Sequence, residues 1–208
     1  MELGIRGLGD RVQTALADSL TALSAHDLAL ADRVVRSDVE INRLRYDLES
    51  QASLRLAATT DSMEVRALVA GLYVLADLER IGDHAEGIAK VALMLGPSPT
   101  MNIPSVISAM GVQVQDMVGR TLSAYIRKDA EAARVLCAED DEVDALYDRA
   151  YGEMLSAMAG DRHLVSEGTY LLWVTHNLER IADRATNICE RVVFQVTGRV
   201  EELNVSKY

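Results

Sequence analysis

Proline is almost absent from this sequence of 208 residues, and the only three, Pro97, Pro99 and Pro104, stand together near its middle. Aromatic residues make up 4% of the chain, while 49% of it is hydrophobic and much of that is alanine and leucine. Strands favour aromatic and β-branched residues, and proline interrupts helices, so this composition predicts helices rather than sheets. The proline cluster is expected to be a linker between two helical parts.

Cysteine is equally scarce, since Cys137 and Cys189 are the only two and are not spaced as metal ligands. This pattern excludes a disulfide scaffold and suggests a reducing compartment. The amino terminus has no long apolar core of a signal sequence, and the prolines interrupt the uncharged stretch 91–115. We therefore expect a soluble cytoplasmic protein that is at most peripheral to a membrane.

Clusters of lysine and arginine are missing as well, and the formal net charge is −11. An acidic chain without a basic patch is repelled by phosphate backbones, which argues against direct nucleic-acid binding. No glycine-rich phosphate loop and no nucleophile elbow is present. The usual sequence signatures of catalysis are therefore lacking.

The chain does contain an internal repeat. LERIGDHAEGI at 78–88 and LERIADRATNI at 178–188 share seven of eleven positions, at an offset of 100. Acidic positions further upstream repeat at an offset of 102, as with Asp38 and Asp140. A duplication of this kind predicts two similar structural units.

Each unit is expected to contain three helices, giving an all-α fold of two tandem, pseudo-symmetric three-helix bundles. Asp27 and Asp129 are equivalent candidate caps, and the chain is expected to bend near Asp27. The expected units are 1–96 and 105–208, joined by the linker 97–104, and the expected helices are 10–36, 38–58, 62–95, 103–137, 139–159 and 163–198.

The acids fall at matching heights in these hairpins. Antiparallel helices rise equally per residue, so positions equidistant from the turn lie level. A first turn between residues 60 and 61 places Asp38 level with Asp83, and Asn42 level with Glu79. A second turn between 161 and 162 does the same for the second unit, with the pairs Asp140 and Asp183, and Asp144 and Glu179.

Carboxylates this close cannot all remain ionised unless a cation joins them or some are protonated. Oxygen ligands suit magnesium, manganese or iron better than zinc, and carboxylate bundles with di-iron sites are the physical precedent. The alternative is that Arg80 and Arg180 neutralise the acids as ordinary ion pairs. The predicted metal ligands are Asp38, Asn42, Glu79, Asp83, Asp140, Asp144, Glu179, Asp183 and Asn187.

The second unit is the stronger candidate, because all four of its central groups are carboxylates and Asn187 is expected to extend their face. In the first unit Asn42 replaces an acid and Gly87 stands where the second copy has Asn187. His176 and Trp173 fall in an apolar stretch and are expected to be core residues.

The two motifs, LERIGDHAEGIAK at 78–90 and NLERIADRATNICERV at 177–192, resemble those of the PhoU family, and the likeness covers nearly the whole chain. The resemblance implies a cytoplasmic, non-enzymatic regulator of phosphate uptake that links a phosphate ABC transporter to a sensor histidine kinase and keeps the starvation response off. It also implies a homodimer, and metal clusters on the repeated acidic motifs.

Two other classes remain open. A di-metal carboxylate enzyme would use a His three residues after the Glu of each motif, and neither Glu79 nor Glu179 has one. A metal-free helical scaffold would keep the acids as a solvated face.

Overall fold

The computed structural model describes residues 1–203, and within them every regular element is a helix. The predicted all-α fold of two tandem three-helix bundles is confirmed. The helices are α1 Glu2–Ala25, α2 Leu28–Ala58, α3 Ser62–Leu95, α4 Ser105–Arg127, α5 Ala130–Ala138, α6 Asp140–Gly160, the short 3-10 helix η1 Arg162–Leu164, and α7 Val165–Thr197.

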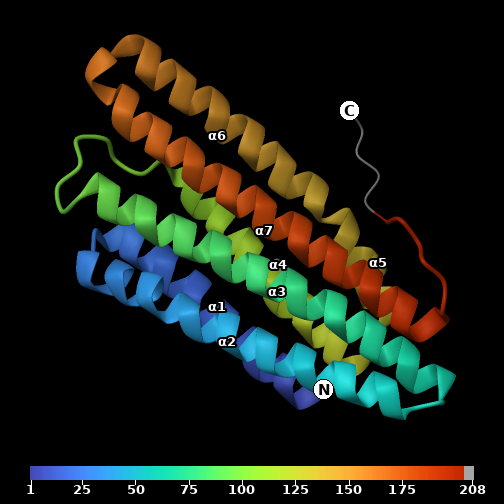
Figure 1. Ribbon diagram of the computed structural model, residues 1–208. Helices are drawn as coiled ribbons and strands as arrows, with labels where there is room; N and C mark the ends of the chain where they lie inside the picture. Colours follow the sequence, from blue (N-terminus) through green and yellow to red (C-terminus); the bar gives the residue numbers. More distant parts are fainter. Residues whose placement is uncertain (204–208) are drawn as a thin grey trace.

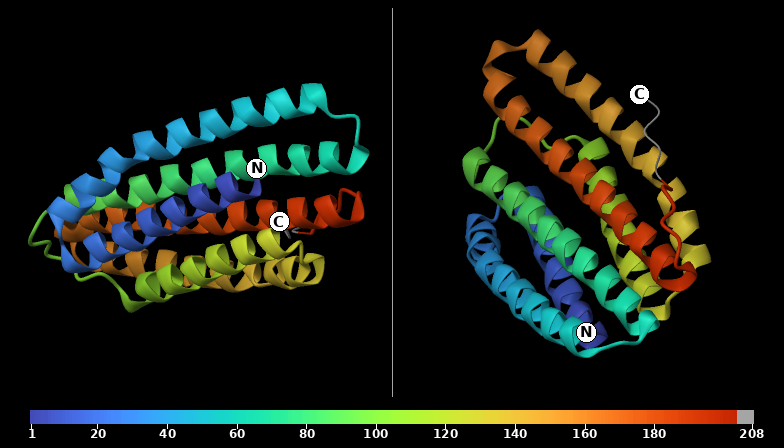
Figure 2. Two further views of the ribbon diagram at one scale, coloured as in Figure 1. Left: turned by 90° about the horizontal axis from the view of Figure 1, so that it is seen from below. Right: turned by 45° about the vertical axis from the view of Figure 1, so that its right-hand side comes forward.

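The third helix of each bundle lies at the centre of the molecule. Figure 1 shows α3 and α7 side by side, with α2 along one edge and α6 along the other. α1 and α4 lie behind them and pack on each other, as the turned views of Figure 2 also show. The two bundles therefore meet through two pairs of equivalent helices, α3 with α7 and α1 with α4.

Two glycines make the contact between α1 and α4 close, and they are equivalent in the repeat. A Cβ on Gly9 would stand 2.9 Å from Leu122, and a Cβ on Gly111 would stand 3.1 Å from Leu20. Each leucine packs onto the glycine of the other bundle, so the contact is reciprocal. The internal duplication in the sequence thus appears in space as approximate two-fold symmetry.

The ends of the helices differ from the sequence prediction in the first bundle. α1 starts at Glu2 rather than near residue 10, and the expected bend is a complete break at His26, which has φ 52°. Asp27 then caps α2 by accepting from the Leu30 N–H at 2.9 Å. α2 continues without interruption to Ala58, so the expected boundary near residue 37 is wrong.

The second bundle breaks twice where the first breaks once. The helix expected over 103–137 stops at Lys128, which has φ 55°, and Asp129 caps α5 by accepting from the Ala132 N–H at 3.0 Å. A second break at Glu139 separates α5 from α6. α5 and α6 together therefore correspond to α2.

The central helices are less completely buried than their apolar stretches predict. Leu75 and Val174 are fully buried, but Tyr73 is 54% exposed and Trp173 is 48% exposed, so Trp173 is not a core residue. Across residues 1–203, no helix combines the length and the apolar character needed to span a bilayer.

Candidate functional site

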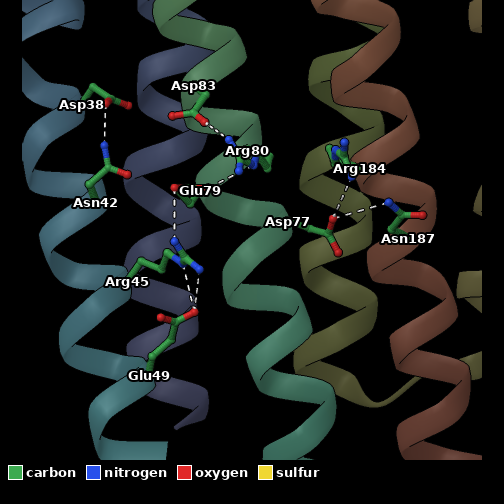
Figure 3. Close-up of polar contacts among 10 residues, drawn as sticks. All are labelled: Asp38, Asn42, Arg45, Glu49, Asp77, Glu79, Arg80, Asp83, Arg184 and Asn187. Atoms are coloured by element: carbon green, nitrogen blue, oxygen red, sulfur yellow. Dashed lines mark hydrogen bonds and ion pairs between the residues drawn. The ribbon is translucent and has the colours of Figure 1, made fainter.

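The acids of the first bundle gather between α2 and α3. A Cβ on Gly82 would stand 3.8 Å from Asp38 Oδ1, which places Asp38 at the predicted height. Figure 3 shows Asp38 and Asn42 pointing from α2 toward α3, where Glu79 and Asp83 stand opposite. Asn42 Nδ2 donates to Asp38 Oδ2 at 2.7 Å. The hairpin thus brings these four side chains onto one face.

Arginines neutralise the two acids that α3 contributes. Arg45 on α2 donates through Nη1 to Glu79 Oε1 at 3.3 Å and through Nε to Glu49 Oε1 at 3.0 Å (Figure 3). Arg80 donates to Asp83 Oδ2 at 2.9 Å, and its Nε lies 3.6 Å from Glu79 Oε2. Glu79 is only 7% exposed, so its contact with the partly buried Arg45 is largely shielded from water, whereas Arg80 is mostly exposed.

The pKa of Asp38 is raised above the ordinary value of an aspartate. Burial, together with the charges of Glu86, Asp83 and Glu79, raises its pKa to about 6, against the opposing effect of Lys90. Lys90 Nζ also donates to Glu86 Oε2 at 2.7 Å. Asp38 Oδ1 is buried and has no hydrogen-bond partner. The group therefore contains one buried oxygen that could accept a proton or a cation.

The second bundle repeats the gathering between α6 and α7. Burial, together with the nearby charges of Asp183, Asp144 and Asp140, raises the pKa of Glu179 to about 7, against the opposing effect of Arg180. Glu179 Oε2 is buried without a hydrogen-bond partner. The charges of the three other acids therefore all act on Glu179, so the four carboxyl groups lie near one another.

Two basic side chains border this second group. Arg180 Nη1 lies 3.5 Å from Asp183 Oδ2, and His176 Nδ1 lies 3.7 Å from Glu179 Oε2. The side chain of His176 is 56% exposed, so it is a neighbour of the carboxylates and not the core histidine that was expected. Arg80 and Arg180 thus neutralise Asp83 and Asp183 as ordinary ion pairs. Asp38 and Glu179 each keep a buried oxygen without a hydrogen-bond partner.

One predicted ligand lies elsewhere. Asn187 does not extend the carboxylate face; its Nδ2 donates to Asp77 Oδ1 at 3.4 Å across the contact between α3 and α7 (Figure 3). Arg184 Nη1 lies 3.6 Å from the same oxygen. The heights of the acids within a hairpin do not specify how α7 is turned toward α3, and that rotation decides where Asn187 points.

Asp77 was missed by the sequence analysis, although it directly precedes the first LERI motif. Burial raises its pKa to about 6, against the opposing effects of Asn187, Arg184 and Arg191. Its position in the second copy is Asn177, an uncharged residue. An acid in one copy and an amide in the other was the available signal.

The donor set favours a hard cation, but the side chains are not arranged as a finished site. Within residues 1–203, no three or more His, Cys, Asp or Glu side chains are placed to hold a metal ion together. The buried oxygens of Asp38 and Glu179 have no hydrogen-bond partner and lie near other carboxylates, the kind of ligand that hard cations prefer. Metal binding by these groups stays a prediction.

Both halves of the chain match a known family. The family described as PhoU domain matches residues 5–92 and again 107–192. The chain is 38% identical to the phosphate-specific transport system accessory protein PhoU homolog of Caulobacter vibrioides, over 94% of this chain and 85% of that protein. It is 32% identical to the homolog of Clostridium acetobutylicum, over 95% and 91%.

Solved structures agree with this assignment. The crystal structure of PhoU from Pseudomonas aeruginosa superposes with a TM-score of 0.91 at 30% identity, covering 94% of this chain and 95% of that one. The phosphate transport system regulatory protein PhoU from Streptococcus pneumoniae gives 0.90 at 29% identity, covering 97% and 95%. Repeat, fold and sequence thus agree, and the chain belongs to the PhoU family.

Proposed function

We propose that this chain is a cytoplasmic, non-enzymatic regulator of phosphate uptake that binds a hard cation between α6 and α7. It acts as an adaptor between a phosphate ABC transporter and a sensor histidine kinase, and holds the starvation response off while phosphate is plentiful. Relatives that are named as accessory proteins of phosphate-specific transport support a role in phosphate transport. The observation that carries the cation site is the buried Oε2 of Glu179, which has no hydrogen-bond partner and lies within reach of the charges of three other acids.

Asp140, Asp144, Glu179 and Asp183 are the residues that would hold the ion, which magnesium, manganese or iron would suit. When bound, the ion would neutralise the group and offer open coordination positions to phosphate or to an acidic partner surface. Glu179 would have to release its proton first, so binding should strengthen as the pH rises through about 7.

The two alternative functions are less well supported. A di-metal enzyme would need histidine among its ligands, and His84 instead directs Nδ1 to Asn177 Oδ1 at 2.9 Å across the contact with α7. In a metal-free scaffold, burying Glu179 beside other acids would cost free energy with no compensating cation. The homodimer implied by the family resemblance stays a prediction.

Isothermal titration can test the adaptor role. Protein loaded with Mn²⁺ is expected to bind the ATPase subunit of the phosphate transporter, and metal-free protein to bind it more weakly. Glu179→Gln should behave as metal-free protein under both conditions. Asp148→Asn, which removes an exposed acid from α6, is the matched control and should behave as wild type. Equal binding by loaded and metal-free protein would exclude a cation-dependent adaptor.

A further inference from the structure

One charged side chain of the first bundle, Arg45, contacts the central acid Glu79 and has no charged counterpart in the second bundle. We propose that Arg45 is the resident cation of the first bundle, so that cation binding in this chain is confined to the second. The inference rests on the proposed function for the second site. It concerns Arg45 itself, which reaches Glu79 at 3.3 Å and Glu49 at 2.9 Å.

The location of Arg45 leaves little room for another cation. Its side chain is 21% exposed and that of Glu79 is 10% exposed, so the pair is largely shielded from water. Glu79 would be the central ligand of any ion here, and its two oxygens already face Arg45 and Arg80. A metal ion would have to displace a guanidinium that then remained close by, and two cations sharing one site repel each other.

The repeat shows that the second bundle lacks this arrangement. At the offset of 102, Arg45 corresponds to Tyr147 and Glu49 corresponds to Tyr151. These tyrosines stack on each other, with ring centroids 6.3 Å apart. A neutral aromatic pair thus replaces a charged pair at the same height, and a tyrosine ring cannot neutralise Glu179 as a guanidinium neutralises Glu79.

Two further replacements act in the same direction. Asn42, which cannot carry a negative charge, corresponds to Asp144, so the first bundle has one carboxylate fewer at this level. Lys90, which lowers the pKa of Asp38 and contacts Glu86, corresponds to Glu190. The first bundle therefore supplies its own positive charge, whereas the corresponding positions in the second are neutral or acidic.

Electron paramagnetic resonance of free Mn²⁺ counts the ions bound per chain and gives the test. Glu79→Gln with Asp83→Asn should leave the wild-type binding unchanged, and Glu179→Gln with Asp183→Asn should abolish it. Giving the first bundle the pattern of the second, with Asn42→Asp and Arg45→Tyr, should add binding there. Arg43→Tyr, an equal change at an exposed position of α2, should add none.

The reverse exchange protects the test against a variant that fails to fold. Tyr147→Arg with Asp144→Asn gives the second bundle the pattern of the first and should abolish Mn²⁺ binding. The inference is overturned if the Glu79 variant loses bound Mn²⁺, or if the Asn42→Asp, Arg45→Tyr variant folds and gains none. Should wild-type protein bind no Mn²⁺ at all, the proposed cation role fails, while a gain in that variant would still support the assignment of Arg45.

Discussion

Asp77 and Asn177 occupy equivalent positions in the two bundles, and each reaches across to the central helix of the other. Asp77 contacts Arg184 and Asn187 on α7, and Asn177 Oδ1 accepts from His84 Nδ1 on α3 at 2.9 Å. The contact between α3 and α7 is therefore built from two versions of one arrangement. One version contains a charge and the other contains an amide.

Replacing Asp77 by asparagine should stabilise the protein at pH 8. Burial raises the pKa of Asp77 to about 6, so at pH 8 it is ionised in a place that favours its neutral form. The gain should be about 1–2 kcal/mol, allowing for partial exposure and the lost contact with Arg184. Urea unfolding measures it, with Asp47→Asn on the exposed face of α2 as control. A loss of stability would mean that the Arg184 contact outweighs burial.

The free energy of unfolding should fall as the pH rises from about 5 to 8. Asp38 and Asp77 have folded-state pKa values of about 6 and Glu179 of about 7, all above their unfolded values. A raised pKa contributes stability that is complete below the unfolded pKa and is lost as the pH passes the folded one. Unfolding in urea across this range should show the decline, and the triple variant Asp38→Asn, Asp77→Asn, Glu179→Gln should flatten it. An unchanged slope would refute the assignment.

Glu179→Gln should separate stability from cation binding. Metal-free protein should gain about 1–2 kcal/mol at pH 8, because a buried charge surrounded by like charges is removed. The rise in melting temperature that Mn²⁺ gives to wild type should disappear. Differential scanning calorimetry with and without Mn²⁺ records both effects. If the variant is less stable and still responds to Mn²⁺, Glu179 is not a ligand.

Gly87→Ala should destabilise the contact between α3 and α7 despite the better helix propensity of alanine. A Cβ on Gly87 would stand 2.9 Å from Asn177 Oδ1, the atom that contacts His84, so Asn177 would have to give up that contact. The net loss should be about 1 kcal/mol. Gly152→Ala on α6, where no atom lies within 4 Å, should instead gain up to about 1 kcal/mol. Urea unfolding of both variants makes the comparison, and equal gains would contradict it.

Much of the site followed from the sequence because helical rise is constant. Once the two turns were located, the heights of Asp38 and Glu179 relative to their neighbours were determined. The helix breaks were harder to predict, since helices commonly end on a left-handed glycine. Here His26 and Lys128 take that conformation, and neither residue type signals it.

Other features depended on tertiary packing that no spacing encodes. Arg45 lies about one turn along α2 from Asn42, the residue level with Glu79, and its long side chain spans that distance. The conformation of such a side chain cannot be predicted from residue spacing. Asn187 and Asp77 meet because of how α3 and α7 are rotated against each other. The repeat pointed to Asn187 in the sequence without showing its partner, and it did not point to Asp77.

Anomalous diffraction from crystals soaked in Mn²⁺ tests the central claim most directly, because it locates the ion itself. The predicted result is a peak between α6 and α7 beside the Glu179 carboxylate, with none between α2 and α3 where Arg45 lies. Absence of density beside Glu179, or peaks of equal height in both bundles, would contradict the account.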